Sequence, residues 1–200
     1  MRHTQTVKTI RRAALYEGAA VIGGLIAVMW LLQIINAIDG QALDGDGIHP
    51  RSLAGLPGII SAPFLHAGFG HLIGNSIPLV ILGLVIAAAG ARRVVEVTLV
   101  VLAIAGLGTW LTGPSHTSTI GASGLVFGYA GFLVARGFFT RSFGALAIGV
   151  AVALLFGVSL ASDLVPQSGV SWQDHLFGAI GGIAAARLVS RGRGAQTILP

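Results

Sequence analysis

The chain has 200 residues, of which 54% are hydrophobic and 10% charged, and its mean hydropathy is +0.85. Soluble domains use about 45–50% apolar and 25% charged residues, so this composition excludes an ordinary water-soluble globule. The net charge of +5 comes from basic residues that stand singly or in pairs, without the basic stripe that nucleic acid requires, and we expect no nucleic acid partner. The absence of cysteine excludes disulfides, a thiolate zinc site and a cysteine nucleophile.

Six apolar segments follow one another along the chain and predict an all-α fold, a bundle of six transmembrane helices. A segment that crosses the bilayer core should be helical, because lipid offers no hydrogen-bond partner to the backbone. The segments cover approximately residues 18–38, 72–91, 94–112, 120–135, 143–161 and 172–186. We predict a single polytopic membrane domain over residues 1–200, with a core at 18–188 and cytoplasmic tails at 1–17 and 189–200.

The charges divide unequally between the two sides of this predicted bundle. One side receives 11 of the 12 basic residues, whereas the other receives four aspartates and a single arginine, Arg51. By the positive-inside rule, both termini are predicted to be cytoplasmic. The N-terminal apolar segment lacks a clear cleavage site and is predicted to be a retained span. The lack of a transit-like N-terminus and the compact frame favour a bacterial plasma membrane.

Two outer connections are unusual. Residues 39–70 form the longest one, and their apolar part at 53–65 predicts a segment that lies in the membrane interface. Residues 113–119 are polar and uncharged, and they lead into a span that is short for a bilayer that needs roughly 20 helical residues. Because irregular backbone at membrane depth requires protein or water beside it, we expect a wet cavity open to the outer side.

A serine and a histidine are predicted to lie at the same depth in this cavity. Ser123 is 13 residues from the cytoplasmic Arg136, and His175 is 12 residues from the cytoplasmic Arg187, so both lie roughly 18–20 Å above that boundary. A nucleophile and its general base need such a juxtaposition. The alternatives are a serine that caps a helix and a histidine at the membrane interface.

Glycines on the same two segments favour close contact between them. Gly121, Gly124, Gly128 and Gly131 recur at helical spacing around Ser123, and Gly178 and Gly182 follow His175. Small residues let membrane helices approach closely. The stripes are also compatible with simple helix packing.

A second polar pair, His71 and Asn75, stands at the outer end of the segment at 72–91. Four residues apart on a helix, the two side chains share a face. Polar side chains in a membrane helix are costly and indicate a functional site; here they would donate hydrogen bonds to an oxyanion. The alternative is polar contact between helices.

Taken together, these residues resemble the rhomboid family of intramembrane serine proteases. The resemblance rests on His66-Ala67-Gly68-Phe69-Gly70-His71-x-x-x-Asn75, Gly121-Ala122-Ser123-Gly124 and His175-x-x-Gly178-x-x-x-Gly182, in a frame of six spans. It implies that Ser123 is the nucleophile and His175 the base. It also implies an oxyanion hole formed by His71, Asn75 and the Ser123 backbone N–H, with His66 structural in the outer loop.

The chain departs from the family pattern at two positions. Asp174 replaces the usual alanine before the histidine, and Phe127 stands where the family often has tyrosine. Phe127 lies on the Ser123 face and is expected to stack beneath the imidazole, whereas Asp174 should point about 100° away around the helix. We therefore predict a dyad and not a triad.

The predicted function is hydrolysis of peptide bonds in or next to transmembrane segments of other membrane proteins, without a metal or organic cofactor. No H-E-x-x-H motif supports a zinc protease, and Asp163 and Asp174 stand at span edges, where an aspartyl protease would need buried carboxylates. Glu96 is expected to form an ion pair with Arg92 and Arg93. The alternatives are a non-catalytic protein of the same shape that binds client helices and a small solute transporter.

Overall fold

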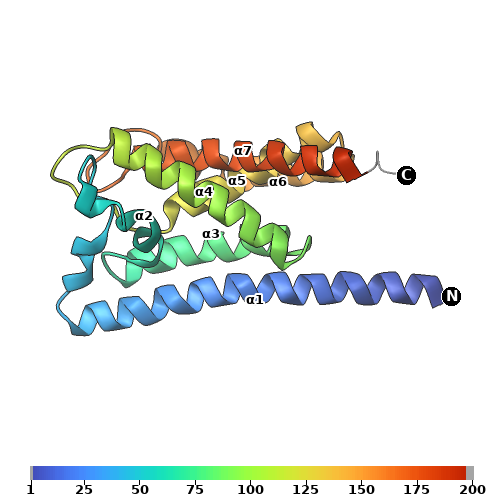
Figure 1. Ribbon diagram of the computed structural model, residues 1–200, viewed down its shortest axis with the longest axis horizontal. Helices are drawn as coiled ribbons and strands as arrows, with labels where there is room; N and C mark the ends of the chain where they lie inside the picture. Colours follow the sequence, from blue (N-terminus) through green and yellow to red (C-terminus); the bar gives the residue numbers. More distant parts are fainter. Residues whose placement is uncertain (1, 197–200) are drawn as a thin grey trace.

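The computed structural model describes the backbone of residues 2–196 and the side chains of residues 9–191. Within that part, the fold is all-helical, as predicted, with isolated bridges and no strand (Figure 1). The α-helices are α1 (Arg2–Ile38), α2 (Gly58–Ser61), α3 (Phe69–Ala87), α4 (Ala91–Thr112), α5 (Ser123–Thr140), α6 (Phe143–Ser162) and α7 (Trp172–Gln196). Three short 3-10 helices, η1 (Ala42–Asp46), η2 (Leu53–Gly55) and η3 (Ala62–Phe64), lie between α1 and α3.

Five helices of the described part are long and apolar enough to cross a membrane: α1 from Thr9 onward, α3, α4, α5 and α6. These are the helices of a multi-pass membrane protein. The remaining long helix, α7, is apolar in its first half and carries Arg187 and Arg191 in its second.

Several helices are longer than their apolar segments. The predicted N-terminal tail at 1–17 is helical from Arg2 onward, and α7 continues to Gln196, ten residues beyond the predicted end at 186. Helix α7 thus extends beyond the predicted apolar segment. Lysine and arginine are good helix formers, so the end of an apolar segment marks a change of environment and not the end of a helix. Met1 and residues 197–200 of the predicted C-terminal tail lie outside the described residues.

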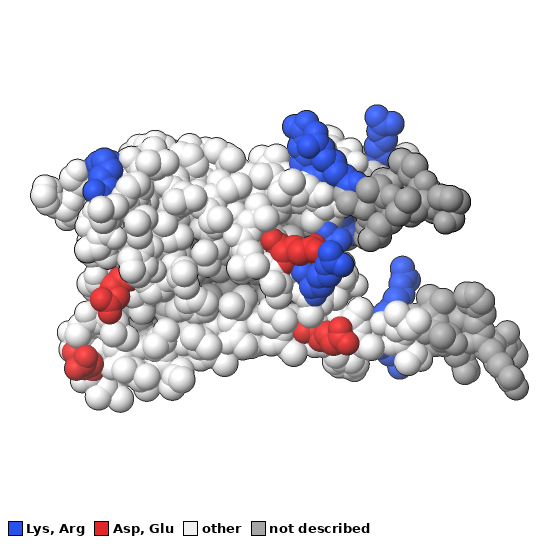
Figure 2. Space-filling model, viewed as in Figure 1, with Lys and Arg blue, Asp and Glu red and all other residues white. Residues whose placement is uncertain are grey.

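The basic side chains are distributed unequally between the two ends of the molecule. Figure 1 shows the first turn of α1 and the last turn of α7 at the same end of the bundle, and the connection between α1 and α3 at the opposite end. On the face shown in Figure 2, most basic side chains lie toward the end with the termini, where acidic side chains accompany them, and the opposite end shows mainly acidic side chains.

Helix α5 is the centre of the bundle. In its most apolar stretch 56% of the residues are buried, compared with 17% in α6 and 22% in α1. The most extensive helix pair is α5 with α7, and α7 also packs on α4. Tyr129 and Phe132 of α5 are fully buried in the common core, together with Leu79 of α3. The helix that begins at Ser123 is therefore held on several sides.

The long connection between α1 and α3 supports the segment that leads into α5. Ile48 and Thr119 exchange backbone hydrogen bonds of 2.9 and 3.0 Å. The Arg51 guanidinium donates to the carbonyl oxygens of Leu111 and Gly113 at the end of α4, at 3.2 and 2.8 Å. Protein groups thus satisfy the backbone of Thr119 and the carbonyl oxygens at the end of α4, as the sequence expectation of a segment at membrane depth would require.

Candidate active site

Ser123 is the first residue of α5, and its half-buried side chain stands at the head of that buried helix. The backbone turns sharply before it, because Gly121 has a φ of +119°, a conformation that residues with a Cβ rarely adopt. The Gly121 N–H donates to the Ala62 carbonyl oxygen at 2.8 Å. Gly121 therefore belongs to the turn, and not to a helical stripe as the spacing predicted.

His175 lies in the first turn of α7 and is 4% exposed. Its Nδ1 is 2.8 Å from the Asp163 carbonyl oxygen at the end of α6. Because a carbonyl can only accept, Nδ1 carries the proton and the Nε2 of the neutral ring is an acceptor. The imidazole stacks on Phe127, with 4.2 Å between the ring centroids and 5° between the planes, which is the arrangement expected from the sequence. The ring is thus fixed in both orientation and tautomer, as a general base requires.

Glycines bring the backbones of α5 and α7 into contact. A Cβ built on Gly178 would overlap the carbonyl oxygen of Gly124, and one built on Gly182 would overlap that of Gly128. The predicted close approach of these helices is confirmed. The position of Gly128 differs from the prediction in one respect: its own Cβ would point away from α7, into Val101 of α4.

His71 and Asn75, whose spacing predicted a shared helix face, both lie close to Gly121. A Cβ on Gly121 would lie 2.6 Å from His71 Cε1 and 3.4 Å from Asn75 Nδ2. The Asn75 Nδ2 atom is buried and has no hydrogen-bond partner within the described residues. A buried donor without a partner is costly, and this one is beside the turn that precedes Ser123.

His66 supports this pair from the outer loop. The side chain is completely buried, and its ring meets the ring of His71 edge-on at a centroid distance of 5.1 Å. Burial, with a smaller contribution from His71, lowers the pKa of His66 to about 4. Its imidazole is therefore neutral at physiological pH.

Asp174 occupies a place that the sequence did not predict. Its carboxylate is buried and interacts with the backbone N–H of Gly124 and the Ser123 hydroxyl, and it accepts from the Thr109 hydroxyl at 3.4 Å. The Nδ1 of His175 contacts the Asp163 carbonyl oxygen instead. The available signal was a carboxylate next to an apolar helix, since charged groups at membrane depth are rarely without a function.

A cavity of about 810 Å³ lies beside His71, and neither Ser123 nor His175 is among its lining residues. His71 lines it, together with residues 117–120 before α5 and residues 166–173 of the α6–α7 connection. Its walls are largely loop residues at the end of the bundle opposite the termini, where the sequence predicted a cavity. Among the described residues, no group of three His, Asp or Glu side chains is placed to hold a metal ion.

Comparison with known proteins places these residues in a family context. A family model described as "Rhomboid domain" matches residues 54–192. The chain is 40% identical over 195 residues to the uncharacterized protein Rv1337 of Mycobacterium tuberculosis (strain H37Rv), an alignment that covers 94% of this chain and 81% of the relative. The uncharacterized protein ML1171 of Mycobacterium leprae is 39% identical, with 92% and 76% covered. A Bacillus subtilis relative named "Putative rhomboid protease YdcA" is 27% identical, with 90% of each chain covered.

Proposed function

The chain belongs to the rhomboid family, and from that premise we propose that it is an intramembrane serine endopeptidase that uses a Ser123–His175 dyad. The observation that carries the proposal is the fixed imidazole of His175. Its Nδ1 is held by the Asp163 carbonyl oxygen and its face by Phe127, which leaves Nε2 as the proton acceptor. Since α5 and α7 meet backbone to backbone at Gly124 and Gly178, this acceptor belongs to the helix that packs on the nucleophile's helix.

In the proposed reaction, the Ser123 Oγ attacks the carbonyl carbon of the client peptide bond while His175 Nε2 takes the hydroxyl proton. The tetrahedral intermediate collapses when the imidazolium protonates the leaving amine, which gives an acyl-enzyme. Water from the outer cavity then attacks the acyl carbon, with His175 again as the base. Ser123 leaves as the hydroxyl form, and the second product carries the new carboxylate.

The oxyanion of both intermediates would be bound by the Ser123 backbone N–H, Asn75 and His71. The unpartnered amide nitrogen of Asn75 beside Gly121 supports this role. Donors that are already oriented toward a developing charge are worth more in a water-poor site than in solution. Gly121 would keep open the space that the client carbonyl needs.

We propose that α7 is the sixth transmembrane helix and that both termini are cytoplasmic, in a single domain with its core at 18–188. The basic end of the bundle supports this orientation (Figure 2). The cavity then opens toward the outer side of a bacterial plasma membrane. Clients would be membrane proteins that present a transmembrane segment, or the residues next to it, to that cavity.

The test uses the full-length protein in liposomes with a panel of single-span client proteins that carry a tag at each end. Wild type is expected to release two fragments from at least one client, and Ser123→Ala is expected to release none while it remains folded. A fluorophosphonate probe should label Ser123 in wild type and label His175→Ala much more slowly. Binding of clients without cleavage and without labelling would overturn the proposal in favour of a non-catalytic client-binding protein.

A further inference from the structure

Helix α5 begins without a cap of its own. The residue at its N-cap position is Ala122, whose side chain cannot accept a hydrogen bond. The first backbone N–H groups of a helix have no partner inside the helix and need acceptors from elsewhere. Because Ala122 and Gly124 are buried, water is a poor substitute at this end. Another side chain has to supply the acceptor.

Asp174 is placed to supply it from α7. Its carboxylate interacts with the Gly124 N–H in the first turn of α5 and with the Ser123 hydroxyl. A carboxylate is also favoured electrostatically at the positive end of a helix dipole. The Ser123 N–H, which lies beside the reacting hydroxyl, is the donor that the proposed mechanism assigns to the oxyanion.

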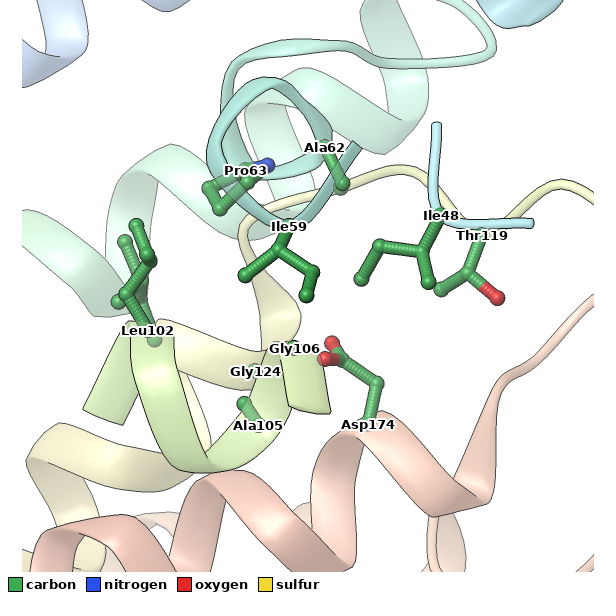
Figure 3. A pocket seen from close by; sticks show the side chains of 12 residues that line it. Ile48, Ile59, Ala62, Pro63, Leu102, Ala105, Gly106, Thr119, Gly124 and Asp174 are labelled. Carbon is green, nitrogen blue, oxygen red and sulfur yellow. The ribbon is translucent and has the colours of Figure 1, made fainter. Parts of the chain in front are cut away.

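The fit around this carboxylate is close. A Cβ built on Gly124 would lie 2.5–2.8 Å from the carboxylate atoms of Asp174. Figure 3 shows the Asp174 carboxylate directed into a small cavity that is lined by α4, α5, Ile59 of α2 and the loop residue Ile48. The cavity measures about 20 Å³, enough for about one water molecule. The site thus accommodates a buried carboxylate, although an apolar side chain would cost less desolvation free energy there.

We propose that Asp174 is a positioning residue, which caps α5 from the neighbouring helix through the Gly124 N–H and so fixes the first turn of α5, where Ser123 lies, relative to His175. The inference rests on the proposed function. It gives two consecutive residues of α7 complementary tasks, since Asp174 holds the start of the nucleophile's helix and His175 accepts the nucleophile's proton. The Asp163 carbonyl oxygen already orients the imidazole, so Asp174 acts through α5 and not through the ring.

The test compares Asp174→Ala and Asp174→Asn in the full-length protein. Asparagine caps helices about as well as aspartate, so Asp174→Asn should stay within about threefold of wild type, whereas Asp174→Ala should lose about tenfold or more. The readouts are the rate at which a fluorophosphonate labels Ser123, and kcat and KM for a client that wild type cleaves. Loss should fall on the labelling rate and kcat, with KM unchanged. Asp46→Asn, at an exposed carboxylate in the outer loop, is the matched control.

A second variant, Gly124→Ala, keeps the inference testable if Asp174→Ala folds poorly, and the double variant shows whether both changes act on the same contact. Gly124→Ala should slow labelling because its methyl group displaces the carboxylate, and adding Asp174→Ala to it should cost no further activity, since the contact is already lost. Wild-type labelling by Asp174→Ala would overturn the inference, as would equal losses in Asp174→Asn and Asp174→Ala, which would assign the effect to charge. Fully additive losses in the double variant would overturn it too. If wild type neither cleaves a client nor is labelled, it is the proposed function that fails.

Discussion

The imidazole of His175 lies flat on the ring of Phe127, with 4.2 Å between the centroids and 5° between the planes. Phe127 is one turn after Ser123 on α5, so the residue that stacks on the proposed base belongs to the helix of the proposed nucleophile. The Asp163 carbonyl oxygen holds the same ring at its edge, from the end of α6. Orientation of the base therefore depends on two helices besides its own.

Phe127→Leu should slow fluorophosphonate labelling of Ser123 by about 2- to 10-fold, the equivalent of a lost aromatic stacking contact. Leucine fills most of the volume, so the melting temperature should change little, and Phe127→Tyr should keep the wild-type rate. Phe143, which is 91% exposed at the start of α6, provides the control Phe143→Leu. A Phe127→Leu variant with the wild-type labelling rate would show that the stack does not position the base.

Asn75→Ala should lower kcat by about 10²- to 10³-fold and leave KM nearly unchanged, because the lost donor acts on the transition state. Its buried amide nitrogen has no partner in the described part of the chain, so the variant should melt no lower than wild type. Client cleavage kinetics and thermal unfolding measure the two quantities. A raised KM with an unchanged kcat would move Asn75 to a binding or packing role.

Its neighbour Ser76 supplies the matched control. The Ser76 hydroxyl accepts from Trp30 Nε1 at 3.2 Å and joins α3 to α1. Ser76→Ala should therefore lower the melting temperature without a large change in kcat. Asn75→Ala is expected to show the opposite pattern, with a lower kcat and an unchanged melting temperature. The two adjacent residues would then be assigned to catalysis and to helix packing, respectively.

The helices could be predicted from the sequence because lipid makes apolar runs helical, but their ends could not. Arginine and lysine continue a helix beyond the apolar segment, as α7 does after Arg187. The structure of the connection between α1 and α3 could not be predicted either, because this connection is held by contacts such as the backbone hydrogen bonds between Ile48 and Thr119. These contacts join residues far apart in the sequence, which no local pattern reports.

For the candidate site, spacing was informative wherever one helix carries both residues. His71 and Asn75 share a face, and Phe127 follows Ser123 by one turn. Spacing did not predict contacts between different elements. These are the contact of the Asp163 carbonyl oxygen with His175 and that of the Gly124 N–H with Asp174. Backbone groups carry no sequence signature, so these two contacts required the structure.

Stability should depend on pH through His66. Burial lowers the pKa of this histidine to about 4 from its ordinary 6.5, so between these values the unfolded chain binds a proton that the folded protein does not. Linkage then makes stability fall as the pH falls through this window. The melting temperature of the wild type in detergent should drop between pH 7 and pH 5, and His66→Gln should flatten that drop. His116→Gln, at an exposed histidine, should follow the wild-type curve, and a His66→Gln curve parallel to wild type would contradict the assignment.

Close contact between α5 and α7 provides the last prediction. A methyl group at Gly182 would overlap the Gly128 carbonyl oxygen and lie 2.7 Å from the Phe132 nitrogen. One at Gly178 would overlap the Gly124 carbonyl oxygen, close to Ser123. Neither backbone can yield without moving a helix, so Gly178→Ala and Gly182→Ala should force α5 and α7 apart. Because displacements of about 1 Å can cost about 10²-fold in rate, both variants should be nearly inactive.

The controls are glycines of α6 that face open space. A Cβ at Gly144 or Gly157 would meet nothing within 4 Å, so alanine there should be tolerated. Gly149 is unsuitable, since its Cβ would lie 3.0 Å from the Val134 Cα on α5. Labelling of Ser123 is measured well below each variant's melting temperature. Slow labelling then reports a displaced Ser123 and not an unfolded protein. If Gly178→Ala and Gly182→Ala were labelled as fast as Gly144→Ala, the nucleophile and the base would not depend on this helix contact, and the proposed dyad would lose its structural support.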